Sequence, residues 1–173
     1  MQDAITTILN QYDLIGKYLD KGAMNKLNTY FNTATDRLRA MEIIISKSSK
    51  IVKETASRLY SEQPELLRPG GNSYTTRRYA TCLRDIDYYL RYASYALIAG
   101  SKDILSERLL DGLKETYLSL SVPIGPTILS IEILKNVVSE EISNNNNDIS
   151  LEDLKVLTEP FDYISQTLSE KNI

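Results

Sequence analysis

Cys82 is the only cysteine of the chain, and charged residues surround it at helical spacing. In an α-helix, Arg78 four residues earlier and Asp85 three residues later lie on the same face as Cys82. Arginine binds carboxylates through paired, charge-assisted hydrogen bonds, and a nearby cation favours the nucleophilic thiolate. This arrangement of thiol, cation and carboxylate suits covalent attachment of a prosthetic group that has acidic arms.

The same face and its neighbours supply further groups for such a site. Arginines that favour the thiolate and could pair with acidic arms are Arg77, Arg78 and Arg84. The Asp85 carboxylate would accept hydrogen bonds from ring N–H groups. Flat, amphipathic packing surface would come from Tyr88, Tyr89 and Tyr92.

The residues alone leave three other interpretations of Cys82 open. A free cysteine on a helix is most often a small core residue, and Arg78 and Asp85 could simply pair with each other. Full burial is disfavoured because unpaired charge is costly to bury. A thiol redox or peroxidase site usually needs a resolving cysteine, which this chain lacks. The last interpretation is an anion site with an incidental cysteine.

Composition excludes several classes of function. The chain has no histidine, which excludes Ser-His-Asp and Cys-His catalysis and histidine-based haem or zinc sites. Its 173 residues fit one domain, and a net charge of −3 gives no reason to expect a nucleic-acid partner. One cysteine suits a reducing compartment. We expect no transmembrane segment, no signal peptide and no enzymatic turnover.

Apolar residues recur at helical spacing almost throughout, so we predict an all-α fold of about eight helices. The first 31 residues are predicted to form a helical hairpin interrupted at Gly22. Two helices with a join at 46–49 are expected over 33–61. The later elements are expected to be a loop around 64–73, a helix from 76 to 99 ended by Gly100, two short helices around Gly112, a break over Pro123, Gly125 and Pro126 followed by a helix through 128–138, a polar loop at 144–147 and a last helix through 154–168.

Several segments resemble the phycobiliproteins, and most closely their allophycocyanin beta-type subunits. The matching segments are DAIT at 3–6, GKYLD at 16–20, RPGGNSYTTRRY at 68–79, CLRDIDYYLRYASY at 82–95, LKETY at 113–117 and VPIGPT at 122–127. The likeness covers nearly the whole chain. Beta subunits of phycocyanin and phycoerythrin carry further bilin-binding cysteines, whereas this chain has one. The segments PELLRP and PIGP look more like the minor beta-18 core variant than the common beta subunit.

The resemblance implies a role for each matching residue. Cys82 would hold one phycocyanobilin, an open-chain tetrapyrrole, through a thioether, and Asp85 would hydrogen-bond its two central ring nitrogens. Arg77, Arg78 and Arg84 would be candidates for its propionates, although helical spacing turns Arg84 away from Cys82. Asn72 would be the asparagine that the family methylates on its side-chain nitrogen. Tyr88 and Tyr117 would line the pocket.

The resemblance also implies an assembly. The expected fold is a globin-like, bilin-binding body over 33–173 within a single domain, with the hairpin at 1–31 joining it to an allophycocyanin alpha-type subunit. The positions expected to bond across that contact are Asp3, Asp13, Tyr18, Arg91 and Tyr95. Such heterodimers would form stacked trimeric rings with core and core-membrane linker proteins, peripheral on the stromal or cytoplasmic face of the thylakoid membrane of a red-algal plastid or cyanobacterium. The implied function is light harvesting and energy transfer.

Overall fold

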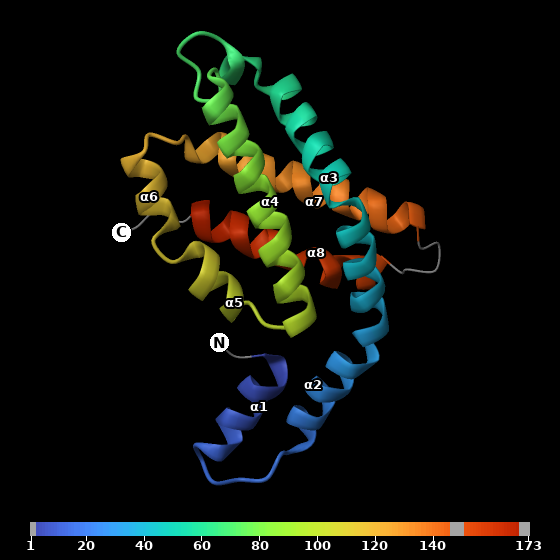
Figure 1. The fold of residues 1–173 in the computed structure, drawn as a ribbon. Coiled ribbons are helices and arrows are strands. Elements are labelled where there is room, and N and C mark those ends of the chain that lie inside the picture. Colours follow the sequence, from blue (N-terminus) through green and yellow to red (C-terminus); the bar gives the residue numbers. More distant parts are fainter. Residues whose placement is uncertain (1–2, 146–150, 170–173) are drawn as a thin grey trace.

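The computed structural model describes residues 3–145 and 151–169, and within them every regular element is helical (Figure 1). This confirms the predicted all-α fold. In chain order the elements are α1 (Ala4–Asp13), α2 (Lys21–Asn32), α3 (Ala34–Glu62), a 3₁₀ turn η1 (Pro64–Leu67), α4 (Thr76–Ala99), α5 (Asp103–Leu105), a π-helical turn η2 (Ser106–Leu110), α6 (Leu113–Ser119), α7 (Ile124–Asn145) and α8 (Leu151–Ser169).

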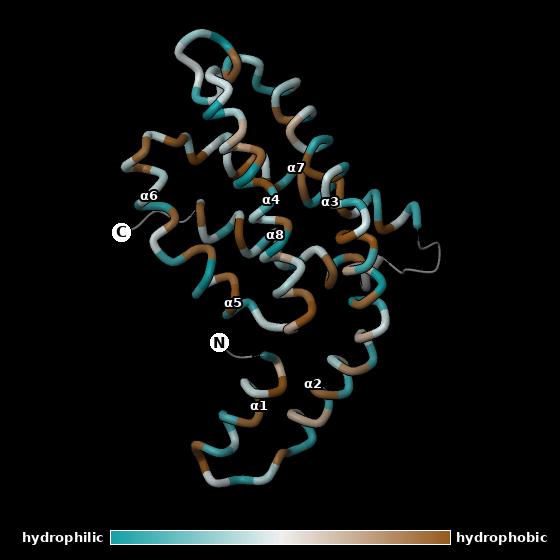
Figure 2. The backbone as a smooth tube through the Cα atoms, in the orientation of Figure 1, coloured by the Kyte–Doolittle hydropathy of each residue, from teal (hydrophilic) through white to brown (hydrophobic). Residues whose placement is uncertain are grey.

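The body of the molecule forms where α3, α4, α7 and α8 cross (Figure 1). Helix α7 packs against both α3 and α8, so it must be apolar over much of its circumference. Its buried apolar residues are Ile131, Ile133, Leu134, Val137, Val138 and Ile142. Figure 2 shows hydrophobic positions recurring along each of the four helices. Their burial provides the main driving force for packing α4 against the rest of the body.

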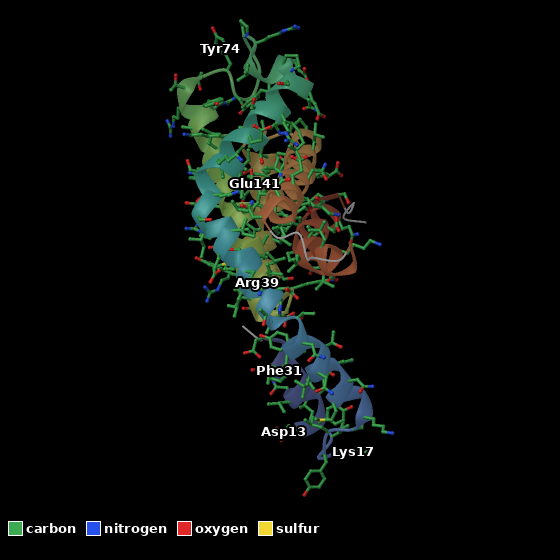
Figure 3. All side chains as sticks on the ribbon, turned by 90° about the vertical axis from the view of Figure 1, so that its right-hand side faces the viewer. Asp13, Lys17, Phe31, Arg39, Tyr74 and Glu141 are labelled. Carbon is green, nitrogen blue, oxygen red and sulfur yellow. The ribbon has the colours of Figure 1, made fainter. Side chains whose placement is uncertain are left out.

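Helices α1 and α2 form the predicted hairpin, which projects away from the body (Figures 1 and 3). Asp3 caps α1 by accepting a hydrogen bond from the Thr6 N–H at 2.7 Å, and Asp20 caps α2 through the Ala23 N–H at 2.9 Å. The prediction that Gly22 interrupts the hairpin is wrong. The break lies between Asp13 and Lys21, because capping by Asp20 starts α2 one residue before Gly22.

The hairpin leaves much of its apolar surface uncovered. Ile8 is buried, but Leu14 is 86% exposed and Tyr18 is 99% exposed. The connection that carries Leu14 and Tyr18 lies at the end of the hairpin that is remote from the body, as the labels of Asp13 and Lys17 show in Figure 3. Large apolar side chains left exposed together on one hairpin favour an interaction site.

Helix α3 is one continuous helix, so the predicted join at 46–49 is wrong. The Ser46 and Ser48 hydroxyls donate to the carbonyls of Ile43 and Ile45, at 3.0 and 3.3 Å. These serines therefore satisfy their hydrogen bonding within the helix instead of ending it. Helix α7 packs along α3 and holds it as one element.

Glycines end α4 and start α6, as predicted. Gly100 follows α4 in the left-handed region, and a side chain there would collide with the Tyr30 ring and the Arg37 guanidinium. Gly112, also left-handed, precedes α6. The polar loop predicted at 144–147 is only partly testable. Asn144 and Asn145 are helical and belong to α7, so the prediction is wrong for them, and Asn146 and Asn147 lie outside the described residues.

Candidate cofactor site around Cys82

One face of α4 forms the wall of a cavity of about 350 Å³. The residues that helical spacing places beside Cys82 all line this cavity: Arg78, Asp85, Ile86 and Tyr89. Arg77 and Thr81, also on α4, line the cavity as well. The remaining lining residues come from the end of α3, η1, the loop before α4, α6, the α6–α7 connection and the start of α7: Leu59, Leu66, Asn72, Ser73, Thr75, Tyr117, Leu120, Val122, Pro123, Pro126, Thr127 and Ser130. A volume of this size, with an apolar lining and a few polar groups, is typical of a small-molecule site.

The loop between η1 and α4 brings polar groups to one edge of the cavity. Gly71 allows this path, because a Cβ atom at this position would collide with the carbonyl oxygens of Glu65 and Leu66. The Ser73 N–H then donates to the Leu66 carbonyl at 2.9 Å. The Asn72 side-chain Nδ2 donates to the Ser121 carbonyl at 2.9 Å, which ties the loop to the connection between α6 and α7.

Cys82 is partly buried and contacts the apolar core as well as the cavity. Burial raises the pKa of its thiol, although hydrogen bonding with Tyr60 and Ser73 partly opposes this effect. The expectation that neighbouring arginines favour the thiolate is therefore wrong for this structure. Arg77 and Arg78 are exposed to solvent, where a guanidinium has little influence on a partly buried sulfur.

Asp85 lies one turn after Cys82 and is held on both carboxylate oxygens. The Arg84 guanidinium donates to Oδ1 from Nε at 3.1 Å and from Nη2 at 2.8 Å. The Tyr117 hydroxyl donates to Oδ2 at 3.2 Å. No ion pair joins Arg78 to Asp85 among the described residues, so the alternative of a simple Arg78–Asp85 pair is wrong. The guanidinium of Arg78 stays available at the cavity.

Tyr89 and Tyr117 meet at the inner end of this polar network. Their hydroxyls are hydrogen-bonded to each other, and both side chains are buried. Burial raises the pKa of each phenol well above its ordinary value. Both tyrosines therefore stay protonated at neutral pH and can act as hydrogen-bond donors.

The structure brings only some of the predicted ligands into the cavity. Asn72, Arg77, Arg78, Asp85 and Tyr117 line it together with Cys82. Arg84 and Tyr88 do not. The Arg84 side chain is 56% exposed and reaches the site only through Asp85. The Tyr88 ring lies on the outer surface of α4, where the Arg91 guanidinium packs 4.6 Å from its centroid.

The predicted interface residues lie on two surfaces. Asp3, Asp13 and Tyr18 belong to the hairpin, and Asp3 already serves as the cap of α1, which lowers its pKa. Arg91 and Tyr95 are exposed one turn apart on α4. All five lie outside the Cys82 cavity. No hydrogen bond or ion pair joins the two surfaces within the described part of the chain.

Two residues near the thiol were missed by sequence reasoning. Ser73 is buried, and Tyr60 packs its ring on Tyr79 with a centroid distance of 5.4 Å. Their electrostatic influence on Cys82 shows that both lie close to it. The helical period of α3 placed Leu59 on its inner face, but nothing local in the sequence showed that Tyr60 would lie close to the thiol.

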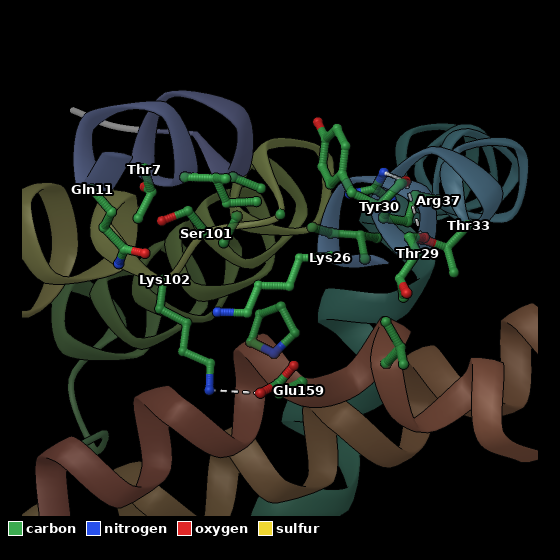
Figure 4. A pocket seen from close by; sticks show the side chains of 17 residues that line it. Thr7, Gln11, Lys26, Thr29, Tyr30, Thr33, Arg37, Ser101, Lys102 and Glu159 are labelled. Atoms are coloured by element: carbon green, nitrogen blue, oxygen red, sulfur yellow. Dashed lines mark hydrogen bonds and ion pairs between the residues drawn. The ribbon is translucent and has the colours of Figure 1, made fainter. Parts of the chain in front are cut away.

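A second cavity, of about 390 Å³, lies between the hairpin and the body (Figure 4). The Lys102 ammonium pairs with Glu159 at 2.6 Å on one side of it. Arg37 is buried on another side, where its guanidinium lies over the Tyr30 ring. This cavity contains no thiol, so it offers no covalent tether.

The described residues contain no cluster of side chains suited to hold a metal ion. Among those same residues, no helix has the length and apolar character needed to cross a bilayer.

Comparison with known proteins identifies the family. The family model described as "Phycobilisome protein" matches residues 7–168. Over 173 residues, covering all of both chains, the sequence is 62% identical to "Allophycocyanin subunit beta-18" of Aglaothamnion neglectum and 55% identical to the protein of that name in Pyropia yezoensis. It is 51% identical over the same full length to "Phycobiliprotein beta chain" of Mastigocladus laminosus. The expected likeness to the beta-18 type is confirmed, and the chain belongs to the phycobilisome protein family, a family of light-harvesting proteins rather than enzymes.

Proposed function

We propose that this chain is a light-harvesting subunit of the phycobilisome core that carries one phycocyanobilin covalently on Cys82. The observation that carries the proposal is the position of the chain's only thiol on the wall of a cavity, one helical turn from a doubly anchored carboxylate. Membership of the phycobilisome protein family gives this geometry its most direct explanation. Neither the family nor the relatives support the redox or sensor alternative.

The donor set of the cavity fits a linear tetrapyrrole. The Cys82 sulfur could form a thioether, the Asp85 carboxylate would accept hydrogen bonds from ring nitrogens, and the exposed guanidiniums of Arg77 and Arg78 would suit two propionates. Apolar lining residues such as Leu66 and Val122 would cover its flat ring surfaces. Arg84 and Tyr88 lie outside the cavity, so we assign them to positioning Asp85 and to the outer surface of α4.

The protein supplies orientation and rigidity, and the bound bilin supplies the absorption of visible light. Asp85 would fix the central rings by accepting their N–H groups, while Arg77 and Arg78 would hold the propionates at the rim. Burial of Cys82 against the core fixes the point of attachment. A pigment held at these positions would be more rigid and would lose less excitation as heat. A light-harvesting site needs this property in order to pass the excitation on.

Asn72 would be the methylated asparagine of this site. One hydrogen of its Nδ2 atom is used by the Ser121 carbonyl, and the second is the position at which a methyl group would replace a hydrogen. Peptide mass spectrometry of the native chain would show the mass of one added methylene unit at Asn72. An unmodified peptide would contradict this assignment without affecting that of Cys82.

The exposed hairpin supports a proposal about partners. We assign its apolar surface to an allophycocyanin alpha-type subunit, with Asp3, Asp13 and Tyr18 on the hairpin and Arg91 and Tyr95 on α4 bonding across the contact. The heterodimers would form stacked trimeric rings with core and core-membrane linker proteins, on the stromal or cytoplasmic face of the thylakoid membrane. Nothing in the charge of the chain calls for nucleic acid.

The visible spectrum of the native protein tests the proposal. The purified chain should be blue, and the pigment should remain on the polypeptide after denaturation in acid and urea. Cys82→Ala should lose the covalent pigment, whereas Ser57→Ala, on the exposed side of α3 and outside the cavity, should keep it. A colourless native chain, or one whose Cys82 is free and reacts with peroxide, would overturn the assignment.

A further inference from the structure

We propose that Tyr89 is a positioning residue that acts through Tyr117 to fix the Asp85 carboxylate toward the cavity. The inference rests on the proposed function, because the bilin is the ligand that Asp85 would serve. Its structural basis is the continuous path of hydrogen bonds from Tyr89 through Tyr117 to Asp85.

The chemistry of the three groups sets the direction of this path. An ionised carboxylate only accepts hydrogen bonds, so the Tyr117 proton must point to Oδ2 of Asp85. The Tyr117 oxygen is then left as an acceptor, and the Tyr89 hydroxyl donates to it. A donor that itself accepts a hydrogen bond is polarised and binds its acceptor more strongly. Tyr89 therefore strengthens the hydrogen bond from Tyr117 to Asp85 without itself hydrogen-bonding Asp85.

The carboxylate is held from two sides by different elements. Arg84, on α4, occupies Oδ1 from the exposed side, and Tyr117, on α6, reaches Oδ2 from the buried side. Each oxygen keeps a lone-pair direction for a further donor. Fixing both oxygens restricts rotation of the carboxylate, so its remaining acceptor positions face the cavity in one orientation.

Because both tyrosines are buried, the hydrogen bonds from Tyr89 through Tyr117 to Asp85 are protected from water. Tyr89 is 2% exposed and Tyr117 is 6% exposed, so bulk water does not compete for their hydroxyls. The burial that raises the pKa of each phenol also keeps both of them protonated. The facing wall, contributed by the start of α7, brings Pro126, Thr127 and Ser130 to the cavity and no charged group. The Tyr89 hydroxyl thus has a role distinct from the packing of its ring.

A pigment-free measurement tests the path directly. The measurement is NMR of apoprotein whose tyrosines are isotopically labelled at the Cζ carbon. The Tyr117 resonance is the one that disappears in Tyr117→Phe. Tyr89→Phe should shift this resonance. Tyr163→Phe is the matched control, because it removes a partly buried hydroxyl that hydrogen-bonds Ser106 at 2.8 Å, and neither of these residues lines the Cys82 cavity. It should leave the Tyr117 resonance unchanged. An unchanged Tyr117 resonance in Tyr89→Phe would overturn the proposal.

Spectra of the pigmented chain test the consequence. Tyr117→Phe should weaken the red band and shift it to the blue. Tyr89→Phe should shift it in the same direction but by less, because it weakens the hydrogen bond from Tyr117 to Asp85 without removing it. The double variant should match Tyr117→Phe alone, because Tyr89 acts only through Tyr117.

Other outcomes separate this inference from the function on which it rests. Additive shifts in the double variant, or no shift in Tyr89→Phe, would leave Tyr89 as a packing residue and contradict the inference. A wild-type chain without covalent pigment would instead contradict the proposed function. In that case the apoprotein resonance of Tyr117 still decides whether Tyr89 is coupled to it.

Discussion

Arg84 donates to a single oxygen of Asp85 through two of its nitrogens, Nε at 3.1 Å and Nη2 at 2.8 Å. The two residues are neighbours in the sequence, so an ideal helix directs their side chains to different faces. The long arginine side chain bends back along the surface of α4 and reaches the carboxylate at the edge of the cavity. Arg84 therefore acts on the candidate cofactor site through Asp85.

Arg84→Gln should weaken the red band of the pigmented chain and shift it to the blue, while the covalent pigment remains. The reason is that Asp85 would lose its anchor on Oδ1 but keep that on Oδ2. The effect should be smaller than that of Asp85→Ala, which removes the acceptor itself. Arg39→Gln, on the exposed side of α3, is the matched control and should leave the spectrum unchanged. Identical spectra for wild type and Arg84→Gln would contradict the positioning role.

In the pigment-free chain, Cys82 should become reactive toward alkylating agents at a higher pH than an ordinary cysteine. Burial raises the pKa of this thiol, so its thiolate fraction at pH 8 is smaller than that of a cysteine in an unstructured peptide. Alkylation by iodoacetamide should therefore be slower than that of the peptide at pH 8, and should increase above the ordinary pKa of 9.0.

The negative charge of Asp85 also raises the pKa of the Cys82 thiol. Asp85→Asn should consequently lower this pKa and speed alkylation at pH 8. Faster alkylation of the wild-type chain than of the free peptide would show an activated thiol, contrary to this structure.

Glu141 should contribute to stability through its contacts between α7 and α3. Its carboxylate is buried and accepts hydrogen bonds from Lys47, at 2.8 Å, and from Lys50. Glu141→Gln should lower the free energy of unfolding by about 1–2 kcal/mol, measured by urea denaturation of the apoprotein. Glu140→Gln, which removes a more exposed ion pair with Arg58, should cost less than about 1 kcal/mol. Equal losses in the free energy of unfolding for the two variants would contradict the idea that burial makes the Glu141 contacts stronger.

The contribution of Glu141 should also depend on pH. Hydrogen bonding by the two lysines lowers the pKa of Glu141 below its ordinary value of 4.5. A lowered pKa in the folded state stabilises the protein above the unfolded-state pKa, and this stabilisation is lost as the pH falls through the folded-state pKa. The difference in stability between wild type and Glu141→Gln should thus be largest at neutral pH and shrink below about pH 4.5.

Gly71→Ala should destabilise the loop that carries Asn72 and Ser73. The added methyl group would collide with the backbone carbonyls of Glu65 and Leu66, and backbone cannot move aside as a flexible side chain would. We expect a loss of about 1–3 kcal/mol in the free energy of unfolding. Gly125→Ala, in the first turn of α7, meets open space and should leave the free energy of unfolding unchanged or slightly raised. A neutral Gly71→Ala would contradict the described path of this loop.

The sequence by itself determined most of the local structure and one wall of the site. Helical periodicity is a local property, so it correctly placed Arg78, Asp85 and Tyr89 on the same face as Cys82. Gly100 ended α4 because a left-handed residue closes a helix whatever packs against it. The family resemblance, carried by contiguous segments, was equally readable without a structure.

Only the tertiary structure decided the electrostatics of the site. Tyr60 on α3, Ser73 in the loop and Tyr117 on α6 reach the Cys82 region through packing between segments that are distant in the sequence. Charges counted along α4 suggested an activated thiol, whereas burial of Cys82 among these elements raises its pKa. Helical spacing also suggested Arg78 as the partner of Asp85, whereas the partner in the structure is the adjacent Arg84. A helical wheel gives only the direction in which a side chain leaves the backbone, while burial and partner choice depend on what the completed fold places opposite it.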